Sequence, residues 1–160
     1  MTFSANRMYR HEVLHINYTT YDTCCDQDSI NMKTHPYIIA LGHEDEEVNH
    51  KRHLYWYAKV LGIYHVNVRV SGQVKTQRME FLWVCWFRQD LNHKGGFKTH
   101  CLHCIGLLDP NDPGFYGFLN PSDVLRAVHL IPTFEIGRKK PVDPEADQDN
   151  EDWEDYYVSM

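Results

Sequence analysis

The stretch of sequence that decides the fold is residues 55–70, which read YWYAKVLGIYHVNVRV. Every second residue from Trp56 to Val70 is apolar or small, whereas the residues between them are mixed in character. This alternation predicts one long β-strand, because successive side chains of a strand point to opposite faces of a sheet. Gly62 lies in the middle and has no side chain, so we expect a bend or bulge there that lets the strand curl around a small barrel.

Shorter segments on both sides of this stretch complete a mainly β domain. Residues 79–88 are apolar on both faces, which predicts a central strand that is covered on two sides. Asn120 and Pro121 are start signals for one short helix, at residues 121–126. The predicted fold class is therefore mainly β, a small curled sheet or barrel with one short helix. Further strands are expected at residues 13–18, 36–42, 97–108 and 128–131, and a loop at residues 22–33.

The same patterns predict one hydrophobic core around the curled sheet. The even-numbered face of residues 55–70 and the apolar partner strand supply most of it. The side chains that we expect to be largely buried are Trp56, Val60, Tyr64, Val66, Val68, Phe81, Trp83, Val84, Trp86 and Ile131.

The net charge of −6 is divided unevenly along the chain. All sixteen Lys and Arg lie at or before Lys140, whereas eight of the 22 Asp and Glu lie in residues 143–155. Runs of like charge are usually solvated and disordered. We therefore predict an N-terminal extension at residues 1–35 that packs on the domain, a β module at residues 36–140, and a disordered, acidic and partly aromatic tail at residues 141–160. The alternative that the final residues begin a strand stays open.

The sequence contains no segment that favours a membrane or a secreted protein. The longest apolar run, residues 81–87, is too short to span a bilayer as a helix. Residues 1–15 lack the apolar region of a secretory signal. We therefore expect a nuclear or cytoplasmic protein, neither secreted nor membrane-bound, with reduced cysteines.

Candidate metal ligands are few and poorly spaced. Cys101 and Cys104 form a C-x-x-C pair that follows His100, but the other cysteine pair, at residues 24–25, is adjacent, and vicinal cysteines rarely bind one zinc ion. Residues 43–47 approach the H-E-x-x-H pattern but end in Glu, so a second histidine ligand is missing. We predict no metal and no cofactor. A site assembled from loop His, Asp and Glu stays open as an alternative.

Aromatic and basic side chains provide the candidate binding site. Tyr55 and Tyr57 are expected on the strand face opposite the core, and Tyr116 lies in a loop rich in Gly and Pro. Aromatic rings that converge at the mouth of a barrel can hold a cation, including methylated lysine. The basic candidates in the same site are Arg88, Arg138, Lys139 and Lys140.

Three segments resemble a bromo-adjacent homology (BAH) domain. They are YWYAKVLGI at residues 55–63, EFLWVCWFR at residues 80–88 and SDVLRAVHLI at residues 122–131. The likeness covers roughly residues 36–135. It implies a mainly β module without enzymatic activity that reads nucleosomes, modified histone tails or partner proteins.

A second resemblance covers nearly the whole chain, from about residue 8 to the end. It is to the C-terminal region of large proteins of Plavaka-type fungal DNA transposons. In those proteins this region follows a transposase-like part with the catalytic carboxylates; here that part is missing, so the resemblance implies no transposase activity. The matching segments are NYTTYD at 17–22, DQDSIN at 26–31, YWYA at 55–58, MEFLWV at 79–84 and GFLNP at 117–121.

The residues and the two resemblances together predict a non-catalytic binding module of a transposon-derived protein. Its expected partner is a chromatin protein or histone tail, or nucleic acid. One alternative is a metal-dependent hydrolase or enzyme fragment that uses loop His, Asp and Glu. Another is a structural tail with no ligand of its own. The oligomeric state stays open.

Overall fold

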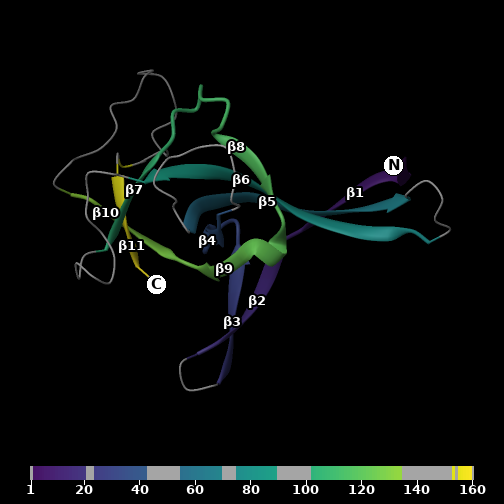
Figure 1. Ribbon diagram of the computed structural model, residues 1–160, viewed down its shortest axis with the longest axis horizontal. Coiled ribbons are helices and arrows are strands. Elements are labelled where there is room, and N and C mark those ends of the chain that lie inside the picture. The colour runs from purple at the N-terminus through teal and green to yellow at the C-terminus, as the bar shows by residue number, and fades with distance from the viewer. Residues whose placement is uncertain are drawn as a thin grey trace.

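The chain folds as a mainly β structure, as the sequence predicts. The computed structural model describes residues 2–20, 24–42, 55–69, 75–89, 102–134, 153 and 155–159, with side chains from residue 7 onward (Figure 1). Within these residues there are eleven strands and one short 3-10 helix. The described strands divide into one large sheet and one separate hairpin.

The large sheet is antiparallel and is built around the two longest strands, β5 (Tyr55–Arg69) and β6 (Gln77–Gln89). Its order is β10 (His129–Pro132), β11 (Asp155–Ser159), β7 (His103–Leu107), β6, β5, β4 (Tyr37–Leu41) and β9 (Val124–Ala127). Two strands lie off this path, β1 (Thr2–His11) on β5 and β8 (Tyr116–Leu119) on β6. The separate hairpin is formed by β2 (Val13–Thr19) and β3 (Cys25–Asn31).

The sheet is strongly curled, because its two end strands are consecutive in the chain. β9 and β10 lie at opposite ends of the strand order, yet only Val128 separates them. The Val128 N–H donates a hydrogen bond of 3.0 Å to the Tyr37 carbonyl of β4. The sheet therefore bends until its ends meet within the chain, although no pairing between β9 and β10 closes it among the described residues.

Two hydrophobic cores form in place of the single core that we predicted. The first lies inside the curl, where each strand of the sheet path contributes, and the second lies where the β2–β3 hairpin covers the sheet. The inner core contains Ile39, Tyr57, Phe87, Ile105, Val128, Tyr156 and Val158. The second contains Ile30, Ile38, Ala40, Ala58, Val60, Ile63, Leu82, Val84, Leu119 and Val124.

A β-bulge in β5 interrupts the side-chain alternation on which the core prediction rests, and that prediction is only partly right. Val60 pairs with Val84 and Gly62 pairs with Trp83, so Leu61 is an extra residue that changes which face each later side chain occupies. Odd-numbered residues before the bulge share a face with even-numbered residues after it. Val60, Val66, Val68 and Val84 are buried as predicted. Trp56, Trp83 and Ile131 are instead exposed, and Tyr64, Phe81 and Trp86 are half-buried.

Gly62 has a specific role beside this bulge. A Cβ atom at this position would overlap the ring of Tyr64. Because glycine has no side chain, the Tyr64 ring packs against the strand and stacks on Phe81, with ring centroids 5.7 Å apart. The expected irregularity at Gly62 is therefore confirmed.

Two predicted local structures are corrected. Part of the expected loop at 22–33 is strand β3, which pairs along its whole length with β2. The expected helix is only one 3-10 turn, Pro121–Asp123, in which the Asn120 side chain accepts a hydrogen bond from the Ser122 N–H. Extended backbone resumes at Val124 because this buried residue must enter β9 and reach the core.

The C-terminal segment is the largest correction. Asp155–Ser159 forms β11, which lies between β10 and β7 and buries Tyr156 and Val158. The prediction of a disordered tail is therefore wrong for these residues, and the alternative of a strand is right. Its apolar side chains alternate as a strand requires, although acidic residues surround them in the sequence. The predicted tail residues 141–152, 154 and 160 lie outside the described part of the chain.

An ion pair across β7 holds β11 in place. Gly106 of β7 lies between Arg88 of β6 and Asp155 of β11. The Arg88 Nη2 and Asp155 Oδ1 atoms are 3.2 Å apart, and a Cβ atom on Gly106 would overlap that carboxylate oxygen. Thr133 adds a hydrogen bond of 2.8 Å from its hydroxyl to the Asp155 carbonyl. The absence of a side chain at Gly106 is thus what lets the two charges meet.

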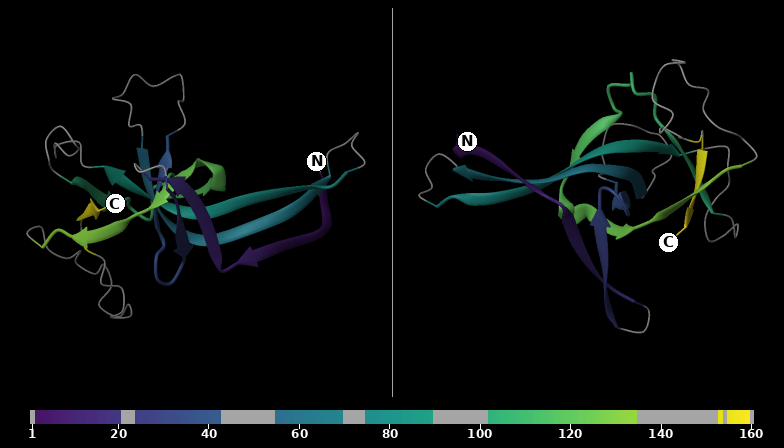
Figure 2. Two further views of the ribbon diagram at one scale, coloured as in Figure 1. Left: turned by 90° about the horizontal axis from the view of Figure 1, so that it is seen from below. Right: turned by 180° about the vertical axis from the view of Figure 1, so that it is seen from behind.

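One part of the sheet projects from the curled body as a ribbon, which we call the arm. It consists of β1, residues 63–69 of β5 and residues 77–81 of β6. Figures 1 and 2 show these strands running together away from the curled strands in all three views. The two faces of the arm differ in chemistry, and this difference defines the candidate site.

Candidate functional site

The predicted aromatic cage does not form, because Tyr57 is buried. Its side chain lies inside the curl and is only 1% exposed. Burial raises the pKa of Tyr57 to about 12, with a smaller contribution from the neighbouring Tyr55. The cause is that both faces of β5 are covered here: Tyr57 lies in the core inside the curl, whereas its neighbour Ala58 lies in the second core. Tyr57 is therefore a core residue and cannot contact a ligand in solution.

The other two predicted tyrosines are exposed but lie on different strands. Tyr55 begins β5, and its backbone carbonyl accepts a hydrogen bond from the Gln89 side chain. Tyr116 begins β8, and its ring lies 5.7 Å from the ring of Trp83. Tyr116 is thus part of an exposed aromatic surface on β8. Tyr55 lies on β5, and β6 separates these two strands.

Of the predicted basic and metal-binding residues, only Arg88 and Cys104 lie in the described part of the chain. Arg88 pairs with Asp155 and so has a structural role. Cys104 is buried in β7. No group of three or more possible metal ligands occurs within the described residues. The remaining candidates lie outside the described residues: Arg138, Lys139, Lys140, His100 and Cys101.

The structure reveals a different group of basic and aromatic side chains on one face of the arm, which we call the basic face. Tyr9 pairs with His65, and His65 pairs with Glu80 across the three strands. Because side chains alternate along a strand, Arg69 and Arg78 lie on this same face. Arg78 and Glu80 form an ion pair of 2.7 Å between their side chains.

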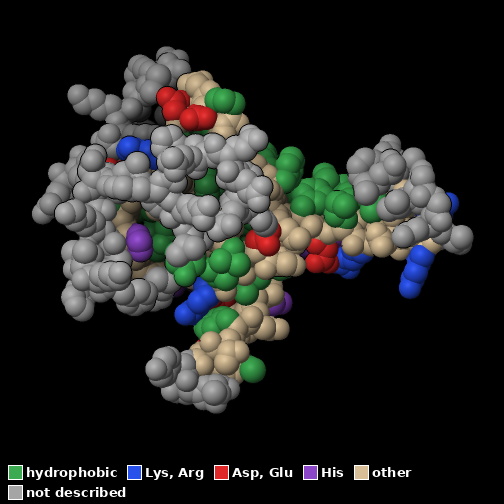
Figure 3. Space-filling view, viewed as in Figure 1, with side chains coloured by type: hydrophobic (Ala, Val, Ile, Leu, Met, Phe, Trp, Pro, Cys, Tyr) green, Lys and Arg blue, Asp and Glu red, His purple; other side chains and the backbone are tan. Residues whose placement is uncertain are grey.

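Cationic side chains exceed acidic ones on the arm as a whole. Its three strands contain four arginines, and Glu80 is their only carboxylate. Lys75 lies just before β6 and is exposed. The space-filling view shows Lys and Arg side chains at the far end of the arm (Figure 3). The arginines are Arg7, Arg10, Arg69 and Arg78.

Three ring side chains form a stack at the base of the basic face. The Tyr9 and His65 rings are nearly parallel, with centroids 4.7 Å apart. His11 Nε2 and His65 Nδ1 are 2.6 Å apart, which is a hydrogen bond between the two imidazoles. Burial lowers the pKa of His65, and the positive charges of Arg78 and His11 lower it further, while Glu80 opposes them. The neutral imidazole is therefore favoured, and an exposed flat ring, Tyr9, is available for stacking.

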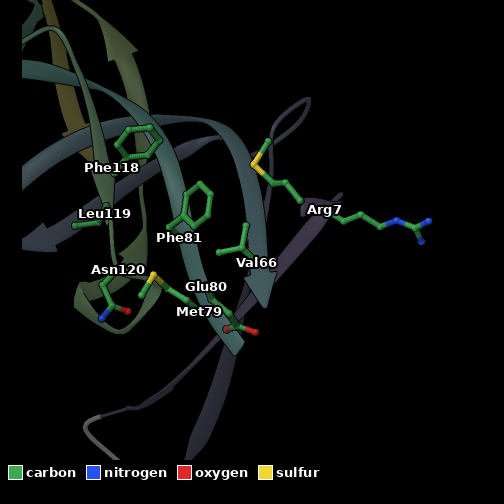
Figure 4. A pocket seen from close by; sticks show the side chains of 9 residues that line it. Arg7, Val66, Met79, Glu80, Phe81, Phe118, Leu119 and Asn120 are labelled. Atoms are coloured by element: carbon green, nitrogen blue, oxygen red, sulfur yellow. The ribbon is translucent and has the colours of Figure 1, made fainter. Parts of the chain in front are cut away.

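The opposite face of the arm is mainly apolar, apart from Arg10 and Gln77, and borders a groove of about 690 Å³. Val66 and Met79 form a cross-strand pair in its wall, and Phe81 lies next to Phe118 of β8. The centroids of these two phenylalanine rings are 5.6 Å apart. Figure 4 shows both rings and Val66 beside the groove, with the Arg7 side chain pointing away from it. Figure 3 shows hydrophobic side chains gathered where the arm meets the body.

Sequence reasoning missed this two-faced arm. The alternation of residues 63–69 does place His65 and Arg69 on one face, and that signal was readable. The contribution of β1 was not readable, because Tyr9 and His65 are brought together by a strand pairing over a separation of more than fifty residues. Such pairings depend on tertiary packing.

No protein-family model, curated protein or solved structure matches this chain. Among the described residues, no helix is long and apolar enough to cross a membrane.

Proposed function

We propose that this protein is a non-catalytic binding module that engages nucleic acid through the basic face of the arm. The observation that carries the proposal is the position of Arg69, Arg78 and the Tyr9–His65 stack on one face of a projecting β-ribbon. A β-ribbon fits the major groove of DNA, where cationic side chains contact phosphates. Exposed aromatic rings can also stack on unpaired bases.

The structure gives less support to the other expected partner, a cationic histone peptide. The cage proposed for it needs Tyr57, which is buried. The charge of the arm has the wrong sign for a cationic ligand, since four arginines oppose one carboxylate there. An anionic ligand is the better complement.

Binding to DNA is tested by fluorescence anisotropy with a short labelled duplex and the matching single strand over a range of salt concentrations. Each phosphate contact contributes roughly −0.9 to the slope of log K against log salt for duplex DNA. We expect Arg69→Gln to make that slope less steep by about 1 and to weaken binding similarly for different sequences. Tyr9→Ala should weaken binding of the single strand more than of the duplex, because it removes a stacking surface.

Lys33→Gln is the matched control, because Lys33 is an exposed cation on the body, in the turn after β3. It should leave both affinity and salt slope unchanged. An equal loss for Lys33→Gln and Arg69→Gln would show that only net charge matters. Binding that does not change with salt would exclude the basic face as the contact surface.

The same proposal places the protein in the nucleus, as part of a transposon-derived protein. The support for the second part is the likeness to the C-terminal region of Plavaka-type transposon proteins. Nuclear accumulation of a tagged chain, together with its recovery on chromatin, would agree with this role. Release from chromatin by Arg69→Gln and Arg78→Gln together would link the location to the arm.

A further inference from the structure

The strand β6 has an uncovered edge on the arm. On the side away from β5, β8 pairs with residues 82–85 and β7 pairs with residues 87–89. No described strand pairs with residues 77–81 on that side. β8 stops at Leu119 because Asn120 and Pro121 turn the chain into the 3-10 helix. The line of β8 is therefore open along β6 beyond the 3-10 helix, which itself contacts β6.

Two hollows follow this open edge. The larger is the apolar groove described above, and the smaller, of about 390 Å³, is lined by Val68, Gln77, Arg78, Met79, Glu80 and Asn120. Met79, Glu80 and Asn120 line both hollows. Figure 4 shows Asn120 at one end of the groove and Met79 and Glu80 along it. The space beside residues 77–81 thus runs the length of the uncovered segment.

Large apolar side chains are exposed along the same edge. Phe118 is 74% exposed and Met79 is exposed as well, and Met8 of β1 is exposed on the far wall of the larger groove. Contiguous exposed apolar surface of this kind marks interaction sites in soluble proteins. It lies on the face of the arm opposite the basic face, so its ligand differs in chemistry from nucleic acid.

We infer that an extended peptide segment of a partner protein binds here by adding an antiparallel strand to β6. Main-chain hydrogen bonds to residues 77–81 would provide affinity, and alternate side chains would provide specificity. Its direction follows β8, which runs antiparallel to β6 on the same line. This site shares Arg78 and Glu80 of β6 with the basic face, but it takes a different ligand and does not depend on the proposed function.

The side chains of β6 specify the pattern of the peptide. Met79 and Phe81 face the apolar groove, so the residues opposite them are apolar. Arg78 and Glu80 face the other side, so the residue opposite Arg78 is acidic and the residue opposite Glu80 is basic. Read from its N-terminus, the peptide is apolar, basic, apolar, acidic, apolar.

The first experiment compares two end-blocked peptides of identical composition, VKVDV and VDVKV, by isothermal titration calorimetry on the full chain. In the antiparallel register VKVDV forms two opposite-charge pairs, whereas VDVKV forms two like-charge pairs. Opposite charges across strands stabilise a sheet and like charges destabilise it, so VKVDV should bind about fivefold tighter or more. Equal binding, tighter binding of VDVKV, or no binding of VKVDV at about 1 mM would overturn the inference.

The second experiment tests the main-chain hydrogen bonds directly. Two N-methylated forms of VKVDV are made. One is methylated at the odd-numbered residues and the other at the even-numbered residues, so that each form loses the N–H groups on one side of the strand. In an added strand only one set of N–H groups points to β6. One methylated peptide should therefore lose binding and the other should keep it. Equal effects of the two methylations would show docking by side chains alone and would refute strand addition.

A pair of protein variants locates the site. Phe118→Ala should weaken VKVDV binding by about tenfold, because it removes an exposed wall of the groove, and little stability is lost when an exposed side chain is truncated. Phe134→Ala is the matched control: this ring is 71% exposed and contacts Trp153, outside the groove. Equal losses for the two variants would place the peptide elsewhere.

A second copy of the chain is the competing occupant of the edge. Sedimentation velocity at the protein concentrations used for titration distinguishes the two cases. We expect a monomer whose sedimentation does not change with Phe118→Ala. A dimer that Phe118→Ala dissociates would show that the edge of β6 binds another copy, and would overturn the inference of a partner peptide.

Discussion

Adding a single methyl group at Gly106 should separate the Arg88–Asp155 ion pair and loosen the C-terminal strand. A Cβ atom at Gly106 would overlap Asp155 Oδ1 and lie 2.9 Å from Arg88 Nε. Gly106 itself is buried in β7, with β6 on one side and β11 on the other, so the methyl group has no open space to occupy. The Gly106→Ala variant must therefore displace at least one of the two charged side chains.

The size of the effect follows from the burial of the two partners. The Asp155 side chain is only 11% exposed, whereas that of Arg88 is 51% exposed. A buried charged group that loses a hydrogen-bond partner destabilises a protein by about 1–3 kcal/mol, and the exposure of Arg88 places this pair toward the lower end. Alanine stabilises a strand by about 0.5–1 kcal/mol relative to glycine, which offsets part of this loss. We expect a net loss of about 1 kcal/mol in the free energy of unfolding.

Urea unfolding followed by tryptophan fluorescence measures this loss, with Gly106→Ala made in the wild-type and in an Asp155→Ala background. With an m-value of roughly 2 kcal/mol/M, the midpoint should fall by about 0.5 M in the wild-type background. In the Asp155→Ala background the overlapping oxygen is gone, so the same substitution should be neutral or slightly stabilising. An undiminished loss in that background would refute the reasoning, as would a loss below about 0.5 kcal/mol in the wild type.

Further predictions concern the core, the titrating groups and the acidic residues before β11. The pKa of Tyr57 is about 12 in the folded protein, above its unfolded value of about 10. The stability that this group contributes is therefore complete below pH 10 and is lost as the pH rises from 10 toward 12. Tyr57→Phe should reduce this loss of stability when unfolding is measured as a function of pH. Tyr156→Ala should lower the free energy of unfolding by about 3 kcal/mol because this ring is buried inside the curl, whereas the half-buried Tyr157→Ala should lower it much less. NMR titration should give His65 a pKa below 6.5 that rises in Arg78→Gln, since the arginine charge favours the neutral ring; an unchanged or lower value would contradict the assigned cause. Replacing the Asp and Glu of residues 143–152 by Asn and Gln should tighten DNA binding at low salt, and this gain should decrease as the salt concentration rises. Deleting residues 143–160 should instead unfold the domain, because the deletion removes β11.

Local patterns in the sequence were sufficient for the main strands. Alternation over residues 55–70 predicted β5 to within one residue, and the apolar run at 79–88 predicted β6. The capping residues Asn120 and Pro121 marked a real turn. These features succeed because side-chain direction and capping depend on neighbouring residues alone.

Residues whose environment depends on a distant strand were predicted less well. Both faces of β5 are covered near Tyr57, so a side chain expected at the surface is in the core, while Trp56, expected in the core, is 46% exposed. The bulge at Leu61 further reverses the alternation of every later side chain in β5, because the side-chain period of a strand is two. The position of a bulge is decided by how β5 pairs with β6, β4 and β1, which no local pattern reveals.

The candidate site and the C-terminal strand likewise depend on pairing with strands that are distant in the sequence. The sequence by itself determined a mainly β chain, its long alternating strand and the surplus of positive charge before residue 141. Only the tertiary structure decided that β1 joins β5 to make a two-faced arm, and that β11 inserts between β10 and β7. The physical reason is that a strand pairs its backbone hydrogen bonds with the segment that tertiary packing places beside it. Burial of Tyr156 and Val158 is therefore enough to form a strand, although acidic residues surround these two side chains in the sequence.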